Sequence, residues 1–584
     1  MILEKIKSPK DLKVLEPADR LELAKELRQV LLYKLSKVGG HNGPNLGVVE
    51  LTLALHTVFN SPEDKLIFDI SHQTYIHKML TGRWESFTNE EKFKEITGYT
   101  DPTESEHDHF VIGHTSTSIS LACGMAKARD LKGTTENVVA IIGDGALGGG
   151  LALEGLSNAG DFQSNLIIIL NDNDQSIAEN HGGLYQNLAE LRAGKGKARS
   201  NLFTALGLDY HYIEDGHDIE TLISKLSEVK ESQKAVLVHV HTIKGKGFEA
   251  AEKNREAFHA GGALDLEKGD YKFKNTKETY TTKIASFLKN EMDQDQTVAL
   301  ITAGTPSVLG FKKEDREKYS KQFIDVGIAE EHAVTMSSAM AKAGAKPVFG
   351  VMSTFVQRTY DQLSHDLAIN SNAATILIYL GGMGGMNDVS HLGFFDIPMI
   401  NNIPNLVYLA ATNLEEQLAM LKYAIHQKNH PTIIRVPVAE LKETGKADLT
   451  DYSILNKYEL THKGSRLAII GVGNFYQMAV ETAELLKEKG INASLINPKF
   501  ISALDEELLD SLLLDHELVI TLEDGQLEGG FGQMIASYYS DKKIKVKNFG
   551  IKKQFIDKYN LEDFKKENSL SPSQIKDYSL QILK

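Results

Sequence analysis

Short runs of apolar, mostly β-branched residues recur along the whole chain, and each is followed by glycine and a helical pattern. Strands that are apolar along their whole length are typical of parallel sheets with helices on both faces. The pattern therefore predicts an α/β protein built from doubly wound, mainly parallel sheets. The runs cover residues 138–142, 166–170, 235–240, 298–302, 375–380, 406–410, 467–470 and 518–522.

Two stretches with few apolar runs, 253–296 and 439–465, interrupt this rhythm and are expected to be linkers. We therefore predict three domains over residues 1–290, 291–445 and 455–584 of the 584-residue chain. Residues 181–200 are rich in Gly, Lys and Arg and are expected to form an exposed loop.

The amino-acid composition argues against several classes of protein. The chain has 79 acidic and 64 basic residues, a formal charge of −15, which argues against a nucleic-acid-binding surface. Its single cysteine, Cys123, cannot form an internal disulfide or a cysteine metal cluster, and we expect it to be buried packing. No apolar segment is long enough to span a membrane, and the first 15 residues do not resemble a secretory signal. A cytoplasmic protein is the expectation.

The strongest local signal is a pair of polar segments, each following an apolar run. Gly143-Asp144-Gly145 follows the run 138–142, and Asn171-Asp172-Asn173 follows the run 166–170. Ligands of open parallel sheets bind outside the carboxyl ends of strands, so both segments can meet at one site. Carboxylate and amide oxygens together with a diphosphate would suit Mg²⁺. Alternatively, each segment is only a strand-to-helix turn, since both compositions are rich in turn-forming residues.

The spacing of these segments resembles the signature of thiamine-diphosphate enzymes. Further segments match, in order, those of the 1-deoxy-D-xylulose-5-phosphate synthase family within the transketolase superfamily. They are residues 39–51, 68–78, 113–119, 326–333 and 353–362. The resemblance covers nearly the whole chain and implies a transketolase-like fold and a role in isoprenoid and thiamine biosynthesis.

The resemblance also implies the residues that hold Mg²⁺ and thiamine diphosphate. Asp144 and Asn173 match the Mg²⁺ ligands, together with a backbone carbonyl near Gln175. Phe355 matches an aromatic residue that packs on the aminopyrimidine ring, and Arg358 follows one helical turn later. The remaining matches to cofactor-contacting positions are His72, Gly113, His114, Thr115, Gly145, Ala146, Asn173 and Phe248.

Three residues are candidates for catalysis. Glu330 matches the glutamate that hydrogen-bonds the aminopyrimidine ring, and burial beside an aromatic ring would raise its pKa so that it can hold a proton there. Alternatively, Glu330 and Glu331 are only N-terminal charges of a helix. His41 and His259 coincide with family motifs and are expected to orient substrate or move protons. His391 is a weaker candidate.

The departures from the family pattern concern the aldehyde acceptor. Met352, Asn401 and Val438 stand where the family has a tyrosine and arginines that bind the phosphate of glyceraldehyde 3-phosphate. Neither an amide nor an apolar side chain replaces the charge and bidentate geometry of arginine. Smaller departures keep size and shape: Ser71 stands for a glycine and Phe248 for a tyrosine.

Two enzymatic hypotheses follow. In the first, the chain decarboxylates pyruvate and joins the two-carbon unit to glyceraldehyde 3-phosphate. In the second, a synthase-like or transketolase-like enzyme uses another donor or an unphosphorylated aldehyde. A third hypothesis, a non-catalytic protein that kept the fold, gives no chemical reason for Asp144, Asn173 and Glu330 to occur together. The resemblance implies a homodimer acting on small-molecule substrates, without nucleic-acid or membrane partners.

Overall fold

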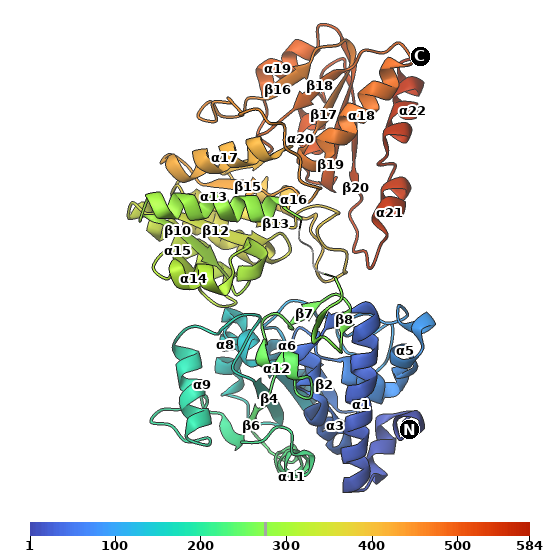
Figure 1. The fold of residues 1–584 in the computed structure, drawn as a ribbon, viewed down its shortest axis with the longest axis vertical. Helices are drawn as coiled ribbons and strands as arrows, with labels where there is room; N and C mark the ends of the chain where they lie inside the picture. The colour runs from blue at the N-terminus through green and yellow to red at the C-terminus, as the bar shows by residue number, and fades with distance from the viewer. Residues whose placement is uncertain (274–276) are drawn as a thin grey trace. The chain divides into compact units, whose positions relative to one another are not determined.

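The protein is described from a computed structural model, which covers residues 1–273 and 277–584. The chain forms two compact units (Figure 1). Unit 1 contains Met1–Thr276 and Gly327–Ala329, and unit 2 contains Lys277–Val326 and Glu330–Lys584. Among the described residues, no helix is both long and apolar enough to cross a membrane.

Unit 1 is built on a five-stranded parallel sheet in the order β2-β3-β4-β6-β5. The strands are β2 (Lys65–Phe68), β3 (Val138–Gly143), β4 (Leu166–Asp172), β5 (Asp209–Ile213) and β6 (Ala235–His241). Helices α3 (Val49–Val58) and α11 (Ile219–Lys230) pack on one face, and α6 (Ser118–Lys132) and α8 (Gly150–Ala159) on the other (Figure 1).

Strand β4 shows why the apolar runs are continuous. Ile167 and Ile169 pack in the core beneath α3 and α11, whereas Ile168 and Leu170 pack in the core beneath α6 and α8. A strand covered on both faces has no position for a polar side chain until it ends. The polar segment at 171–173 lies at the carboxyl end of the strand and is buried as well, so its polar groups need partners inside the protein.

Further helices complete unit 1. Helix α1 (Pro17–Val38) contributes to a separate core with α4 (Tyr75–Lys78) and the irregular helix η3 (Met79–Arg83). Two short helices follow strands or buried loops near the sheet edge: α7 (Asp144–Leu147) and α12 (Glu249–Lys253). The small pair of strands β1 (Gly40–His41) and β7 (Ala260–Gly261) is antiparallel.

Unit 2 contains two sheets. The six-stranded parallel sheet has the order β11-β10-β12-β13-β15-β14, and the five-stranded sheet has the order β16-β18-β17-β19-β20, with β16 antiparallel to β18. The first consists of β10 (Val298–Thr302), β11 (Phe323–Asp325), β12 (Lys346–Met352), β13 (Thr375–Tyr379), β14 (Val407–Ala410) and β15 (Thr432–Arg435). The second consists of β16 (Glu459–His462), β17 (Arg466–Gly471), β18 (Ser494–Asn497), β19 (His516–Gln526) and β20 (Lys545–Ile551).

Helices cover both faces of both sheets in unit 2. On the six-stranded sheet, α13 (Tyr280–Gln294) and α17 (Leu414–His426) lie on one face, and α15 (Glu330–Lys342) lies on the other (Figure 1). On the five-stranded sheet, α18 (Tyr476–Lys487) and α22 (Pro572–Ile582) lie on one face and α19 (Glu506–Leu512) and α20 (Phe531–Tyr538) on the other. One core joins the two sheets, since Phe349 and Ile470 belong to the same cluster.

The eight predicted strands are present, and the predicted doubly wound α/β class is confirmed. The expectation of an exposed loop over 181–200 is wrong, because this segment contains α9 (Gly183–Ala193), whose Leu188 and Leu191 are buried. The expected domain boundary at residue 290 falls inside α13. The expected linker 253–296 includes residues 274–276, which lie outside the described residues.

Candidate active site

The segment 143–145 lies at the carboxyl end of β3, beside the segment that follows β4, and the register pairs Gly143 with Asn171. The Asp144 side chain is buried, and the amide of Asn180 donates a hydrogen bond to its Oδ2 at 2.8 Å. Burial, together with the nearby charge of Asp172, raises the pKa of the Asp144 carboxyl to about 8. The two predicted segments are therefore neighbours, and the acidic group is held out of water.

The oxygen atoms next to Asp144 suit a hard cation. Asn173 Oδ1 is buried without a hydrogen-bond partner among the described residues, so an acceptor there is left open. Nowhere in the described chain do three or more His, Cys, Asp or Glu side chains form a metal-binding group. A cation at Asp144 and Asn173 would take its other ligands from backbone carbonyls, water or phosphate oxygens, which is the usual ligand set of Mg²⁺.

The loop after Asn173 presents backbone carbonyls. Asp174 has a positive φ of 61°, which turns the chain sharply after β4. The side-chain amide of Gln175 donates to Ile177 O at 3.3 Å. The carbonyl of Ser176 accepts a hydrogen bond from Lys244. The backbone carbonyl near Gln175 that is predicted to bind Mg²⁺ therefore belongs to a tight turn that hydrogen bonds hold in place.

Asp172, the middle residue of the second segment, has a structural role. Its carboxylate accepts hydrogen bonds from Arg192 at 2.6 and 2.8 Å and lies 2.8 Å from His239 Nε2. Arg192 belongs to α9, so its ion pair with Asp172 holds α9 against the carboxyl end of β4. From the same helix the Tyr185 hydroxyl donates to Gly145 O at 3.2 Å. Helix α9 therefore covers the 143–145 segment directly.

Three predicted histidines from distant parts of unit 1 form one cluster. The ring of His41 lies 5.0 Å from that of His72 and 6.0 Å from that of His259, and the last two rings are 5.5 Å apart. Tyr99 lies against His41, with 5.7 Å between the ring centroids. Burial, with the charge of Lys244 nearby, holds the pKa of His259 well below its usual range, so this ring is neutral.

The predicted segment 113–115 is held next to α7. Backbone N–H groups of Ser116 and Ser118 donate to the Asp69 carboxylate at 2.7 and 2.9 Å. The Ser116 hydroxyl donates to Ala146 O at 2.7 Å. Gly113, His114 and Thr115 therefore immediately precede a turn that is fastened to the predicted cofactor-binding positions Gly145 and Ala146.

Lys244 is a residue that the sequence reasoning missed. Its side chain is buried, its ammonium donates to Ser176 O, and burial lowers its pKa to about 8. Gly245 and Gly247, both with positive φ, follow it and turn the chain toward Phe248, which packs edge-to-face on Phe258 at 5.6 Å. Lys244 lies three residues beyond the end of β6, and the two glycines after it predict a turn but not the burial of the lysine.

In unit 2, Glu330 is the first residue of α15 and is only 2% exposed. Burial raises its pKa to about 7, and Arg358 Nη1 lies 3.7 Å from Oε2. A solvated helix-terminal charge would not be buried in this way. Phe355 packs edge-to-face against His391 at 5.7 Å, so the predicted aromatic residue and the weaker histidine candidate are in contact.

The three residues expected to alter the acceptor site come from three different segments of unit 2. Met352 is the last residue of β12, and Val438 follows the end of β15. Both residues therefore lie near the carboxyl ends of strands in the six-stranded sheet. Asn401 instead lines a cavity with residues 402–407 and 429–430, which flank the amino ends of β14 and β15. Asn401 directly follows α16 (Asp396–Ile400), and its side-chain oxygen and nitrogen are buried without a hydrogen-bond partner among the described residues, so its place in the acceptor site stays a prediction.

Arg435, the last residue of β15, is fully engaged. It donates to Asp396 at 2.7 and 3.2 Å and also to the carboxylate of Asp524 from the five-stranded sheet. Tyr408 donates to the same Asp396 at 2.5 Å. The guanidinium is thus neutralised by two carboxylates and is not available to a phosphate.

The predicted residues divide between the two units. Those in unit 1 are His41, His72, Gly113, His114, Thr115, Asp144, Gly145, Ala146, Asn173, Gln175, Phe248 and His259. Those in unit 2 are Glu330, Phe355 and Arg358.

Three family models match successive parts of the chain. A family model described as 1-deoxy-D-xylulose-5-phosphate synthase matches residues 3–199 and 192–242. Models of the transketolase pyrimidine-binding domain and the transketolase C-terminal domain match residues 276–443 and 456–575.

Curated relatives match over the full length. The chain is 39% identical to 1-deoxy-D-xylulose-5-phosphate synthase of Shouchella clausii, with 100% of this chain and 99% of that protein covered. It is 38% identical to the enzyme of that name from Caldanaerobacter subterraneus, with the same coverage. Among solved structures, transketolase from Campylobacter jejuni matches with 17% identity and a TM-score of 0.45, covering 97% of this chain and 100% of that one.

Proposed function

The chain belongs to the 1-deoxy-D-xylulose-5-phosphate synthase family of thiamine-diphosphate-dependent, transketolase-type enzymes, and from this premise we propose the reaction and the residues that perform it. The proposed reaction decarboxylates pyruvate and joins the two-carbon unit to an aldehyde, with Mg²⁺ as the metal. We further propose a cytoplasmic homodimer and a division into three domains, with the first boundary near residue 277 in place of 290 and the third domain over 455–584.

One observation supports the proposal most directly. Unit 1 holds a buried carboxyl, Asp144, beside an open amide oxygen of Asn173, and unit 2 holds a second buried carboxyl, Glu330. Burying two such carboxyl groups costs stability. Among the described residues, neither carboxyl has a cationic partner at hydrogen-bond distance that would offset this cost. Groups of this kind are typical of binding and catalytic sites.

The residues of unit 1 would hold the diphosphate end of the cofactor. Asp144 and Asn173, with the carbonyl near Gln175, would bind Mg²⁺, which in turn would bind the phosphates. The buried ammonium of Lys244 and the backbone N–H groups after Gly143 would add positive potential there. When bound, thiamine diphosphate supplies a nucleophilic carbon and the electron sink for decarboxylation.

Glu330 would hold a proton against the ring nitrogen of the aminopyrimidine. Burial raises its pKa to about 7, so the protonated, donating form is populated near neutral pH. Phe355 would pack on the same ring. The His41, His72 and His259 cluster would bind polar groups of the substrate and move protons, and His259 would do so from the neutral form.

A second candidate function is favoured by the residues near the carboxyl ends of β12 and β15. Met352 and Val438 are apolar, and Arg435 is held by Asp396 and Asp524. No charge from these residues is left for a phosphate. An unphosphorylated acceptor, or a different donor, is therefore the alternative substrate class for the same chemistry.

The test is CO₂ release from pyruvate with thiamine diphosphate and Mg²⁺, with and without glyceraldehyde 3-phosphate. Stimulation by this aldehyde, with deoxyxylulose phosphate as product, supports the first function. Release without such stimulation supports the second and calls for a panel of unphosphorylated aldehydes. A protein that binds the cofactor but neither releases CO₂ from pyruvate or another 2-oxo acid nor cleaves a ketose donor to the shortened aldose contradicts both.

A further inference from the structure

Residues 97–101, here called the arch, are held at both ends by carboxylates, the buried Asp108 and the largely buried Glu104. The backbone N–H of Thr97 donates to Glu104, and the backbone N–H of Asp101 donates to Asp108 Oδ2 at 2.9 Å. Tyr99 is the central residue of the arch. The arch belongs to a stretch between η4 (Glu90–Lys92) and α6 that has no helix or strand, and long irregular stretches inside a compact unit are usually functional.

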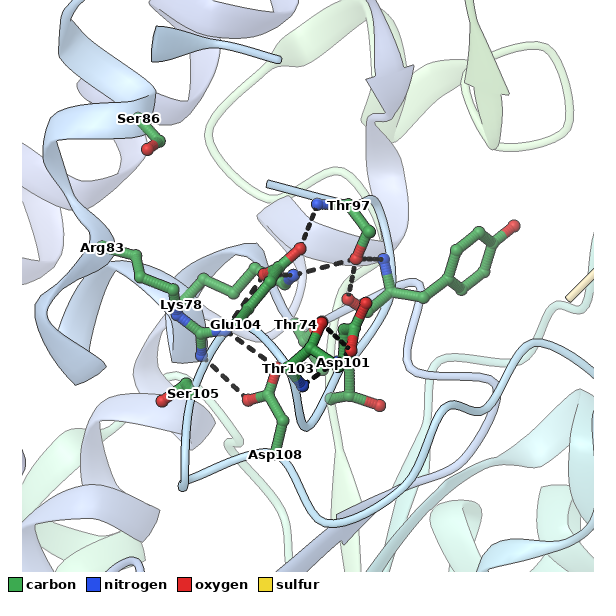
Figure 2. Close-up of polar contacts among 12 residues, drawn as sticks. Thr74, Lys78, Arg83, Ser86, Thr97, Asp101, Thr103, Glu104, Ser105 and Asp108 are labelled. Atoms are coloured by element: carbon green, nitrogen blue, oxygen red, sulfur yellow. Dashed lines mark hydrogen bonds and ion pairs between the residues drawn. The ribbon is translucent and has the colours of Figure 1, made fainter. Parts of the chain in front are cut away.

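The two carboxylates belong to a buried ion network with Lys78 and Arg83 (Figure 2). Arg83 binds Asp108 through both terminal nitrogens, at 2.8 and 2.9 Å, and lies 3.2 Å from Glu104. Lys78 pairs with Glu104, and His77 Nε2 lies 2.8 Å from Asp108. Two cations thus face two anions, which offsets the cost of burying them.

The network reaches the centre of the arch through side chains. Lys78 Nζ donates to Thr97 Oγ1 at 3.2 Å, and Thr97 Oγ1 donates to Tyr99 O at 2.6 Å. On the other side, the Thr100 N–H donates to Ser71 Oγ at 2.9 Å. The backbone of Tyr99 is therefore held from both directions, which limits the positions that its ring can take.

The ring of Tyr99 lies edge-to-face against His41, with an angle of 71° between the planes. Edge-to-face contacts between aromatic rings have a preferred geometry, so a fixed Tyr99 fixes the plane of the His41 ring. His41 is in turn the residue that contacts both His72 and His259.

We propose that Tyr99 is a positioning residue for the reaction: it orients His41, and the Lys78, Arg83, Glu104 and Asp108 network is the clamp that holds it. This inference rests on the proposed function, because it takes His41 as a residue that faces the substrate. Carboxylates that accept hydrogen bonds from two particular backbone N–H groups allow only one register of the loop. An ion network therefore positions Tyr99 more narrowly than apolar packing would.

The first experiment compares Tyr99→Leu with Tyr99→Phe in the holoenzyme. Phenylalanine keeps the ring, so we expect kcat within about twofold of wild type. Leucine removes it, and misorientation of His41 should lower kcat by about tenfold or more while thiamine diphosphate affinity stays within about twofold. Tyr33→Leu is the matched control, because Tyr33 makes a similar edge-to-face contact with Phe93 away from the cluster.

A readout independent of turnover is the NMR signal of the His41 imidazole, assigned with a His41→Gln variant. We expect this signal to move in Tyr99→Leu and to stay nearly in place in Tyr99→Phe and Tyr33→Leu. Wild-type kcat in Tyr99→Leu, or an unmoved His41 signal, would overturn the proposal.

The second experiment tests the clamp with Glu104→Gln, which removes one charge and keeps the shape. We expect the same fall in kcat and the same displacement of the His41 signal as in Tyr99→Leu. If Glu104→Gln does not fold, Thr97→Val removes only the link from Lys78 to Tyr99 and must reproduce both effects in a weaker form. If wild type itself shows no cofactor-dependent turnover, the proposed function has failed, and the His41 signal in Tyr99→Leu and Thr97→Val alone decides whether the arch orients His41.

Discussion

Glu330 Oε2 lies 3.7 Å from Arg358 Nη1, beyond hydrogen-bond distance, and has no hydrogen-bond partner among the described residues. The arginine lowers the pKa of this carboxyl, but burial outweighs it, and the pKa is raised to about 7. The pair therefore keeps an acid that changes its protonation near neutral pH at a buried position.

Glu330→Ala should abolish turnover, with a loss of about 10²–10⁴ in kcat, because a positioned proton donor is removed. The fold and Mg²⁺-dependent binding of thiamine diphosphate should persist, since Asp144 and Asn173 are unchanged. Initial rates of CO₂ release and titration calorimetry measure the two effects. Glu331→Ala is the control, and near-normal turnover in Glu330→Ala would refute the assigned role.

Asp144→Asn should weaken Mg²⁺-dependent diphosphate binding by at least about 10–100-fold, because it removes the only carboxylate proposed as a ligand. The melting temperature without cofactor should not fall, since burial disfavours the charged form of Asp144 and the amide has no such cost. Thermal unfolding with and without cofactor measures both. Asp174→Asn, which removes a largely exposed carboxylate two residues beyond Asp172, is the control; equal effects of the two variants would argue against the metal site.

Met352→Tyr with Val438→Arg should shift acceptor preference toward phosphorylated aldehydes, because it restores a hydroxyl and a free cation at the carboxyl ends of β12 and β15. Asn401→Arg tests the third predicted position separately, because Asn401 also lines a cavity with residues 402–407 and 429–430. Ratios of kcat/KM for paired phosphorylated and unphosphorylated aldehydes measure the shift. An unchanged ratio in all these variants would count against an altered acceptor site.

Glu523 should make unit 2 less stable as the pH rises. The carboxyl accepts hydrogen bonds from the backbone of Phe531 and Gly532, but burial raises its pKa from 4.5 to about 7. A raised acid pKa contributes stability that is present below about pH 4.5 and is lost as the pH rises through 7, on the order of 3 kcal/mol at about 1.4 kcal/mol per tenfold change in acidity.

The measurement is the melting temperature between pH 5 and 8. Glu523→Gln should show a flatter decrease than wild type over this range, because the amide does not ionise. Glu517→Gln on the same strand is the control, since Glu517 is exposed. An unchanged slope in Glu523→Gln would show that this carboxyl does not titrate there.

The fold was predictable because strands buried on both faces must be apolar throughout. Strand β12 was missed because Pro347 and Gly350 interrupt its apolar run. Helix α9 was missed because only two of its side chains, Leu188 and Leu191, are buried. Both are cases in which tertiary packing outweighs local composition.

The site was predictable where chemistry is concentrated in short motifs, as at 143–145 and 171–173. Lys244 was missed because nothing in a lone lysine shows that it will be buried against Ser176. For Asn401, matching residues along a sequence does not show at which end of a sheet the residue lies. The arch could not be inferred either, since its geometry depends on Lys78 and Glu104, which are 26 residues apart in sequence.

The contact of Arg435 with Asp524 has a consequence for engineering. It crosses from the six-stranded to the five-stranded sheet, and one apolar core also spans both sheets. A chimera that exchanges only residues 455–584 would have to supply a carboxylate for a buried guanidinium and a matching half of that core. Recombination with a homologue should therefore use a crossover near residue 277 and transfer both sheets of unit 2 as one block.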